Sequence, residues 1–363
     1  MKLLIAGGGT GGHVFPALAV AREWMARDPG REVIFVGTER GMEMRLIPEA
    51  GLRLETIRSS GLKGIGGLRL ARNVLMLGPG LWDSAAVLRR HKFSAALGVG
   101  GYAAGPMMLM AKLAGVPSVI FEPNAEPGFT NRVLADMATR IATGYPAVAE
   151  RWGNRAVTTG CPVRAEFFAC PPRKPSSPYH ILITGGSQGA QIINRAVIGA
   201  LERLVGENKT SASLAIAHQT GERQYNEVRE AYARHGLEAD VAPFFSNMAE
   251  RFSQADVIVC RAGAITVAEV AAAGRAAIFI PFGAATDSHQ LRNAQEMVRS
   301  DAARLIAEPE LTGERLAREI LALVGEPETI VELGTRARRL ARPNAARDIA
   351  NLIDEVAQGS SRT

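Results

Sequence analysis

Two residues that could exchange protons stand beside turns in this sequence. His13 directly follows the glycine run Gly7–Gly12, and Glu122 ends an apolar stretch before Pro123 and Asn124. A helix is expected to start at the glycine run, and the positive end of its dipole favours the neutral imidazole, which accepts protons. We therefore predict that His13 is a general base and that Glu122 is the second candidate. The alternative is that His13 only organises its loop through hydrogen bonds.

Two glycine runs that follow apolar stretches are suited to binding anions. Gly7–Gly12 follows Lys2–Ala6, and Gly185–Gly189 follows Tyr179–Thr184. Backbone N–H groups at the start of the helix after such a loop can meet a phosphate group. In the second run, the hydroxyl of Ser187 could add a hydrogen bond to the same phosphate.

The first glycine run also fits the GxGxxG fingerprint of nicotinamide dinucleotide enzymes. That fingerprint needs an acid at the end of the second strand, where it binds the ribose. Here the second apolar run ends at Val36, and the nearest acid, Glu39, follows only after Gly37 and Thr38. A nicotinamide-dependent oxidoreductase therefore stays open as an alternative.

A third loop of small residues leads from Cys260 to Glu269. A carboxylate in the first turns of the following helix can accept both hydroxyls of a ribose, or it can simply complement the helix dipole. Arg164 stands near the expected crossing between two domains, where its guanidinium could neutralise a diphosphate. The sequence contains no Asp-x-Asp pair, a motif that commonly holds a divalent metal on a nucleotide diphosphate. We therefore predict a site that uses no metal and no cofactor.

These loops need a scaffold, and the sequence repeats its opening. The order of apolar strand, glycine loop and helix at residue 2 recurs about 177 residues later. In both halves apolar runs alternate with helical patterns, which is typical of doubly wound parallel sheets. Prolines cluster between residues 158 and 178, as in an interdomain linker. We therefore predict an α/β protein with two Rossmann-like domains that face a cleft.

Composition and charge exclude several classes of protein. With 47% apolar and 21% charged residues among 363, the chain is neither disordered, nor collagen-like, nor a coiled coil. Three cysteines without CxxC spacing indicate neither a disulfide framework nor a zinc site, and favour a reduced, cytosolic protein. The uncharged stretch 93–111 is interrupted by glycines and a proline, so no membrane span is expected.

The net charge of +6 is concentrated in one window, residues 61–92. Its cations outnumber its single acid, Asp83, by five, and they alternate with leucines and Trp82. Such a pattern suits a surface that contacts anionic lipid headgroups, although a solvated helix with one packed face would look the same. A nucleic-acid partner is not predicted. The six cations are Lys63, Arg69, Arg72, Arg89, Arg90 and Lys92.

Taken in order, the motifs of this chain resemble those of the MurG family of peptidoglycan N-acetylglucosaminyltransferases. The resemblance covers essentially the whole chain, and the ordered set is more specific than any one motif. The chain has Phe121-Glu-Pro-Asn124 where that family often has His-Glu-Gln-Asn. Roles of the flanking positions of that motif therefore do not transfer. The matching segments are Gly7–His13, Gly100–Pro106, Glu122–Asn131, Gly160–Arg164, Gly185–Ala190 and Cys260–Glu269.

The resemblance implies a GT-B fold and a reaction. An acceptor and membrane domain would span residues 1–162, with a last helix at about 343–358 packing back on it, and a UDP-sugar domain would span 163–342. The enzyme would turn lipid I into lipid II by inverting transfer from UDP-N-acetylglucosamine to the C4 hydroxyl of undecaprenyl-diphospho-muramoylpentapeptide. It would be peripheral on the cytoplasmic face of the cell membrane, serve cell-wall synthesis, shape and division, and possess partners in a cell-wall synthesis complex.

The resemblance also implies roles for particular residues. Ser187 and Arg164 would meet the diphosphate, and Glu269 the ribose. Phe245 would lie against the uracil through its backbone, and Gln290 would read the sugar hydroxyls. The remaining donor contacts would be Thr10, Gly11, Gly12, Asn124, Ala264, Ile265, Thr266, Val267 and Ala268, and the acceptor contacts would be Lys63, Tyr102 and Asn131.

Rival functions remain at the level of sequence. A GT-B enzyme with another lipid acceptor, such as diacylglycerol, would carry many of the same donor motifs, as would a UDP-sugar epimerase. A sensor that binds the nucleotide sugar and scaffolds other proteins without catalysis is a third possibility. Each differs from the main prediction in what happens to the sugar after it is bound.

Overall fold

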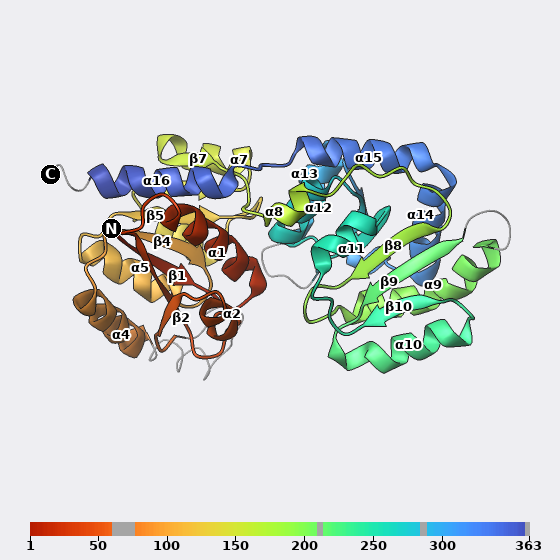
Figure 1. The fold of residues 1–363 in the computed structure, drawn as a ribbon, viewed down its shortest axis with the longest axis horizontal. Helices are drawn as coiled ribbons and strands as arrows, with labels where there is room; N and C mark the ends of the chain where they lie inside the picture. The colour runs from red at the N-terminus through yellow and green to blue at the C-terminus, as the bar shows by residue number, and fades with distance from the viewer. Residues whose placement is uncertain (60–76, 209–212, 284–288, 360–363) are drawn as a thin grey trace. The chain divides into compact units, whose positions relative to one another are not determined.

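A computed structural model describes residues 1–59, 77–208, 213–283 and 289–359 (Figure 1). The chain divides into two compact units: Met1–Val163 with Arg342–Thr363, and Arg164–Ala341. Three of the six cations of the predicted membrane window, Lys63, Arg69 and Arg72, lie outside the described residues.

The first unit is built on a parallel sheet of seven strands in the order β3-β2-β1-β4-β5-β6-β7. Its strands are short apolar runs with both faces covered, so nearly every residue of β1, β2 and β4 is buried, as parallel sheets require. The strands are β1 (Lys2–Gly7), β2 (Glu32–Gly37), β3 (Arg53–Thr56), β4 (Ala95–Gly100), β5 (Ser118–Glu122), β6 (Arg140–Thr143) and β7 (Ala156–Thr158).

The last helix of the chain belongs to this first unit, where it packs beside α1 (Figure 1). Its apolar stripe is buried, and the Asp354 carboxylate accepts hydrogen bonds from Trp24 at 2.8 Å and from Arg27 at 2.8 Å. Partly buried polar and ionic contacts thus hold the last helix to α1. The helices are α1 (Gly11–Met25), α2 (Glu43–Glu49), α4 (Leu77–Arg90), α5 (Ala104–Leu113), α6 (Phe129–Ala135), α7 (Pro146–Glu150) and α16 (Ala345–Gly359), with the 3-10 turn η1 (Gly153–Arg155).

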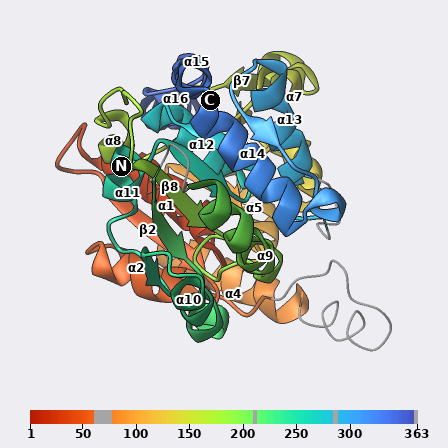
Figure 2. The ribbon, with the colours of Figure 1, turned by 90° about the vertical axis from the view of Figure 1, so that its right-hand side faces the viewer.

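The second unit repeats this plan around a six-stranded parallel sheet in the order β10-β9-β8-β11-β12-β13. Helices α9 and α14 pack against one another on it (Figure 2). The strands are β8 (Tyr179–Thr184), β9 (Leu214–Gln219), β10 (Ala239–Ala242), β11 (Val257–Cys260), β12 (Ala276–Phe279) and β13 (Arg304–Leu305). The helices are α8 (Ala165–Phe168), α9 (Gln191–Asn208), α10 (Tyr225–Arg234), α11 (Met248–Gln254), α12 (Ala264–Ala273), α13 (His289–Arg299), α14 (Gly313–Gly325) and α15 (Pro327–Arg339), with η2 (Glu222–Gln224) and η3 (Glu308–Glu310).

In each unit the strand order reverses between the first strand and a later one. The reversal lies between β1 and β4 in the first unit and between β8 and β11 in the second. Open α/β sheets bind ligands outside the carboxyl ends of the strands at such a point. The glycine loops that the sequence singled out lie at these two places, because they follow β1 and β8 directly.

The predicted fold class is confirmed: the chain forms two doubly wound α/β sheets, and the strand predicted at residues 179–184 has those bounds. The uncharged stretch 93–111 divides into β4 and the first part of α5. Within the described ranges, no helix is both long and apolar enough to cross a bilayer.

Candidate functional site

His13 lies in the first turn of α1, close to the carboxyl ends of β1 and β4. Its Nδ1 is 3.0 Å from the Gly8 carbonyl oxygen, which can only accept, so Nδ1 carries the proton and donates it. In that tautomer Nε2 is the proton acceptor. Burial lowers the pKa of His13 below 6.5, against the opposing effects of the Gly8 carbonyl and of the carboxylates of Glu122 and Glu43. The imidazole is therefore neutral and oriented, as a general base must be.

The glycine loop before His13 contains an internal anion that sequence reasoning missed. The Glu43 carboxylate, 1% exposed, accepts hydrogen bonds from the Gly9 N–H at 2.6 Å and from the Thr38 N–H at 3.0 Å. Its side chain fits because two neighbours are glycines. A Cβ would lie 2.3 Å from it at Gly8 and 2.5 Å from it at Gly37.

Glu43 changes two interpretations of the first loop, namely anion binding by its N–H groups and the place of its nearest acid. The first loop was expected to offer its N–H groups to a bound anion, but the Gly9 N–H already donates to this carboxylate. The acid that the dinucleotide fingerprint requires was sought at Glu39, which is exposed. The signal that could have identified Glu43 is the set of glycines at positions 8, 37 and 41, all of which border its side chain.

Glu122 is buried at the end of β5, with both oxygens engaged. One oxygen accepts hydrogen bonds from the backbone and side-chain N–H groups of Asn124, each at 2.9 Å. The other accepts from the Gly128 N–H and from the Asn131 side chain, also at 2.9 Å. Four donors on one carboxylate favour a role in organising the loop between β5 and α6 over a role as a base.

Replacement of this carboxylate tests that role. In Glu122→Gln, one oxygen becomes an NH₂ group that faces N–H donors, so two hydrogen bonds to a charged group are lost. Each such bond is worth about 1.5–3 kcal/mol, so we expect the first unit to lose about 3 kcal/mol or more of its free energy of unfolding. All three tryptophans lie in this unit, so tryptophan fluorescence in a urea titration reports its unfolding selectively.

The matched control is Glu126→Gln in the same loop. The Glu126 side chain is 35% exposed and pairs with arginines at the surface, where such pairs contribute little. The unfolding midpoint of the Glu126→Gln variant should stay close to that of the unsubstituted chain. Equal midpoints for the Glu122 and Glu126 variants would contradict the organising role.

Of the predicted acceptor residues, Asn131 and Tyr102 are described in the first unit, and Lys63 lies outside the described residues. Asn131 is buried, its side-chain N–H groups donate to Phe121 and Glu122, and its Oδ1 has no hydrogen-bond partner in the described part of the chain. Tyr102 is 59% exposed, with its ring open to solvent. In this region the backbones of Gly8 and Gly101 lie in close contact. A Cβ at Gly101 would lie 2.3 Å from the Gly8 carbonyl oxygen, so a larger residue would not fit there.

In the second unit the loop after β8 has the form expected of a diphosphate site. Ser187 is exposed on it, and α9 starts directly after it. A Cβ at Gly189 would lie 2.0 Å from the Thr220 carbonyl oxygen, so this loop and the one after β9 meet backbone to backbone. The described chain thus presents a loop without bulky side chains at the start of a helix, as anion binding requires.

Glu269 and Arg164 lie together beside this edge of the sheet. Their side chains approach to 4.0 Å, and the Arg164 guanidinium lies over the Phe167 ring at 4.9 Å. Burial raises the pKa of Glu269 to about 7, although Arg164 opposes the shift. The structure therefore brings together the residues predicted to hold the ribose and the diphosphate. It also gives the Glu269 carboxyl a pKa close to neutral pH.

The other predicted residues of α12 fall into a buried set and a partly exposed set, because the helical period places them on different faces. Ala264 and Val267 are buried, so a contact from either to a ligand would come through its backbone. Ile265, Thr266 and Ala268 are partly exposed on the side of Glu269.

The backbone N–H of Phe245 and the side-chain amide of Gln290 each make a hydrogen bond within the protein. The Phe245 N–H donates to the Gln219 side chain at 2.8 Å, so a backbone contact from Phe245 to a base would fall to its carbonyl oxygen. Phe244, which the prediction did not include, is 56% exposed beside it. Gln290, at the start of α13, accepts a hydrogen bond from the Phe282 N–H at 3.0 Å and thereby shapes the loop after β12.

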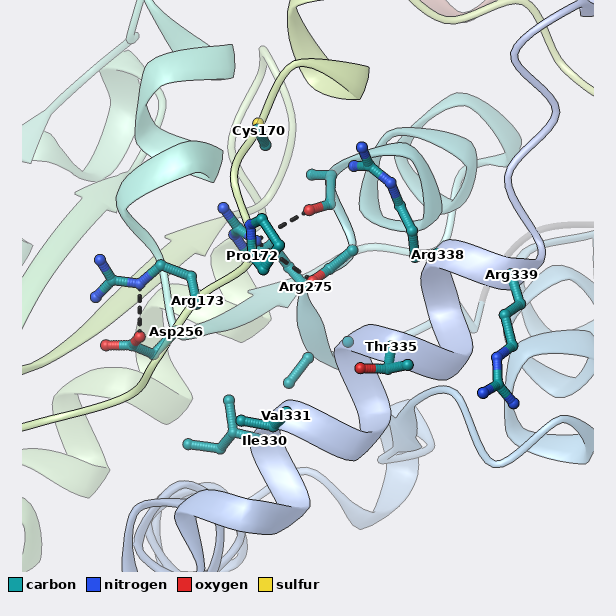
Figure 3. Close-up of a pocket in the computed structure, with 14 residues that line it drawn as sticks. Cys170, Pro172, Arg173, Asp256, Arg275, Ile330, Val331, Thr335, Arg338 and Arg339 are labelled. Atoms are coloured by element: carbon teal, nitrogen blue, oxygen red, sulfur yellow. Dashed lines mark hydrogen bonds and ion pairs between the residues drawn. The ribbon is translucent and has the colours of Figure 1, made fainter.

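A cavity of about 360 Å³ in the second unit lies at the amino ends of β11 and β12, away from these loops (Figure 3). Two of its four arginines are already engaged within the protein. The guanidinium of Arg275 donates to five backbone carbonyl oxygens at helix ends and turns, and Arg173 pairs with Asp256 at 2.8 Å. In the described ranges, no three His, Cys, Asp or Glu side chains are grouped so that they could hold a metal ion.

Comparison with known proteins agrees with this arrangement. Residues 3–143 match the model of the glycosyltransferase family 28 N-terminal domain, and residues 180–353 match that of its C-terminal domain. A protein of Pelobacter propionicus named UDP-N-acetylglucosamine–N-acetylmuramyl-(pentapeptide) pyrophosphoryl-undecaprenol N-acetylglucosamine transferase is 43% identical over 98% of this chain and 99% of its own. Its namesake in Geotalea uraniireducens is also 43% identical, over the full length of both.

A solved structure gives the same result. The crystal structure of Acinetobacter baumannii MurG superposes with a TM-score of 0.80 at 33% identity, over 98% of this chain and 99% of that one. The likeness includes both units, so the fold is GT-B, as predicted. The chain belongs to glycosyltransferase family 28 and, within it, to the MurG family.

Proposed function

We propose that this enzyme transfers N-acetylglucosamine from UDP-N-acetylglucosamine to the C4 hydroxyl of undecaprenyl-diphospho-muramoylpentapeptide, which converts lipid I into lipid II in peptidoglycan synthesis. The observation that carries the proposal is the end-to-end likeness, at 43% identity, to proteins named for this transfer. Family membership decides against a nicotinamide-dependent oxidoreductase and favours a transferase over an epimerase or a sensor.

In the proposed reaction the donor is held by the second unit. The loop that carries Ser187 and the guanidinium of Arg164 would neutralise the diphosphate, and Glu269 would accept the ribose hydroxyls. Charge that develops on the departing UDP would meet N–H donors already in place, which lowers the barrier. Gln290 would contact the hydroxyls of the sugar.

The first unit would bind the acceptor and supply the base. As the C4 oxygen of the muramoyl sugar bonds to the anomeric carbon, the bond from that carbon to the diphosphate oxygen breaks, and UDP departs with the electron pair. The acceptor proton passes to Nε2 of His13, whose other nitrogen is held by the Gly8 carbonyl. Attack from the face opposite UDP inverts the anomeric configuration.

The experiment that tests this function measures transfer of labelled sugar. We expect product with UDP-N-acetylglucosamine and a lipid I analogue, and little with UDP-N-acetylgalactosamine. Equal transfer to diacylglycerol would indicate another lipid acceptor. Conversion of the UDP-sugar without an acceptor would indicate an epimerase, and tight binding with no turnover under any acceptor condition would indicate a sensor.

Attachment to anionic membrane is proposed for the part of the 61–92 window that is described. Trp82 on α4 is 68% exposed, Leu113 at the end of α5 is 71% exposed, and the two helices pack on one another. Arg89 lies over the Trp82 ring at 5.9 Å, and Lys112 stands beside Leu113. Exposed apolar side chains next to cations suit the headgroup boundary of an anionic leaflet.

Cosedimentation with vesicles measures this attachment. Burying a large apolar side chain contributes about 1.5–3 kcal/mol, so Trp82→Ala with Leu113→Ala should weaken binding to phosphatidylglycerol vesicles at low salt by about 100-fold or more. The control is Val331→Ala, which removes an exposed apolar side chain from the second unit. Vesicle binding that does not depend on lipid charge would overturn the proposal. Equal binding by the Trp82 and Leu113 double variant and the Val331→Ala control would do the same.

A further inference from the structure

Gln219 is a buried amide at the carboxyl edge of the second sheet. It is the last residue of β9, it pairs in register with Thr184 at the end of β8, and it is 1% exposed. A buried side-chain amide must find hydrogen-bond partners in the protein, because an unsatisfied polar group is costly to bury. Its partners are the segments to which the proposed function assigns the donor.

The amide of Gln219 joins three segments through both of its ends. Its Nε2 donates to the Thr184 hydroxyl at 3.2 Å and to the Gly186 carbonyl oxygen at 2.9 Å. Its Oε1 accepts from the Phe245 N–H at 2.8 Å. One side chain therefore connects the end of β8, the loop after it and the segment after β10.

The backbone around Gln219 leaves these segments little room to shift independently. A Cβ at Gly189 would lie 2.0 Å from the Thr220 oxygen, and one at Gly221 would lie 2.4 Å from the Gln188 oxygen. The Gly221 N–H also donates to the Pro243 carbonyl at 3.0 Å, which connects the loop after β9 to the segment that contains Phe245. The Gln219 amide is thus the polar link inside a close backbone junction.

We propose that Gln219 is a positioning residue that holds the diphosphate loop and the uracil segment at a fixed separation. The inference rests on the proposed function, in which Ser187 on one segment and Phe245 on the other contact opposite ends of UDP. Gln219 is buried beneath both and acts through Gly186 and Phe245. With the junction intact, the uracil and the diphosphate are received together.

Gln219→Met is the main test, because methionine has about the same length and cannot make these hydrogen bonds. We expect the Kd for UDP, measured by calorimetry, to rise about 10- to 100-fold, since hydrogen bonds to a charged diphosphate are among the stronger ones and are weakened when their donors shift. The Kd for uridine, which lacks the diphosphate, should rise much less. In turnover kcat/KM for the UDP-sugar should fall at least as far as the affinity for UDP, because the diphosphate loop also stabilises the departing UDP.

A second variant separates the two ends of the amide. Gln219→Glu keeps an acceptor for the Phe245 N–H but places a carboxylate oxygen against the Gly186 carbonyl. We expect it to weaken UDP as much as the methionine variant does. The matched control is Gln224→Met, which removes another buried glutamine whose amide bonds Asn194 and Glu227 and neither of the two donor-binding segments. That control should bind UDP as the unsubstituted enzyme does.

The outcomes distinguish this inference from the proposed function. No UDP binding by the unsubstituted enzyme would overturn the proposed function itself. Normal UDP binding by a folded Gln219→Met enzyme would overturn only the positioning role, as would an equal loss of affinity for uridine and UDP. If the variants do not fold, hydrogen exchange on the unsubstituted enzyme decides: the Phe245 amide should exchange slowly without ligand, and rapid exchange would exclude the Gln219 contact.

Discussion

Replacement of His13 by alanine is expected to lower kcat by about 10²- to 10⁴-fold, the range that general-base assistance supplies. The reason is geometric: Nδ1 donates to the Gly8 carbonyl, so Nε2 is the proton acceptor, and burial keeps the ring neutral. The Kd for UDP should change little, because Ser187, Arg164 and Glu269, which are predicted to hold its diphosphate and ribose, lie on the second unit. Turnover with a lipid I analogue and calorimetry with UDP measure the two quantities separately.

The pH profile of the unsubstituted enzyme provides a second reading of the same residue. Because burial lowers the pKa of His13 below its usual 6.5, the acidic limb of kcat, measured with saturating donor, should lie at lower pH than that of an ordinary histidine. In the alanine variant this acidic limb should disappear. A limb that persists unchanged would assign the titration to a group other than His13.

A second substitution separates catalysis from loop organisation. In His13→Asn the side-chain amide can still donate to the Gly8 carbonyl, as Nδ1 does, but it cannot accept a proton at pH 7. An enzyme as slow as the alanine variant would support the base, and recovery of most of the turnover would mean that His13 only organises its loop. His235→Ala is the control, since that half-buried ring bonds the Ala231 carbonyl in the second unit and should leave turnover unchanged.

Glu269→Ala should have the largest effect on donor binding. Two ribose hydroxyls that donate to one carboxylate make two hydrogen bonds to a charged group, worth about 1.5–3 kcal/mol each. The Kd for UDP should therefore rise by about 100-fold or more. Glu314→Ala is the control, because that carboxylate is 72% exposed on α14 of the same unit. Retention of the original UDP affinity by Glu269→Ala would place the ribose elsewhere.

The raised pKa of Glu269 adds a pH dependence to this prediction. Its carboxyl titrates near 7 in the folded protein instead of near 4.5, so UDP, which binds the ionised form, should bind more tightly as the pH rises through 7. At pH 6 the affinity should be about tenfold below its alkaline limit. In Glu269→Gln this dependence should vanish.

The stability linkage of Glu269 has the opposite direction. A carboxyl with a raised pKa holds its proton in the folded state, so its contribution to stability is fully present below about pH 4.5 and is lost as the pH rises toward 7. Ligand affinity and unliganded stability should therefore change oppositely over this interval. Thermal unfolding with and without UDP between pH 5 and pH 8 measures both trends.

Much of the fold was predictable from local pattern. Buried parallel strands are continuous apolar runs, so β8 has the predicted bounds. Glycine runs after such strands fall at the carboxyl edge in any doubly wound sheet, which is why the loops before His13 and around Ser187 were found correctly. The position of Glu269 in the first turns of a helix was also predictable, because it depends on nearby sequence alone.

The parts that were missed depend on contacts between distant segments. Glu43 fills the first glycine loop because α2 brings its carboxylate to the Gly9 N–H, which is 34 residues away in the chain. The number of donors on Glu122 depended on the loop that returns Gly128 and Asn131 to it.

By itself, the sequence determined two glycine-loop units, the order of their elements and the residue types available for chemistry, because these follow from periodicity and backbone freedom over a few residues. Tertiary structure decided which polar groups were already satisfied. It occupied the first loop with Glu43, engaged Glu122 with four donors, oriented His13 through Gly8 and connected the donor segments through Gln219. The physical reason is that a buried polar group is defined by its partners, and those partners come from strands and loops far apart in the chain.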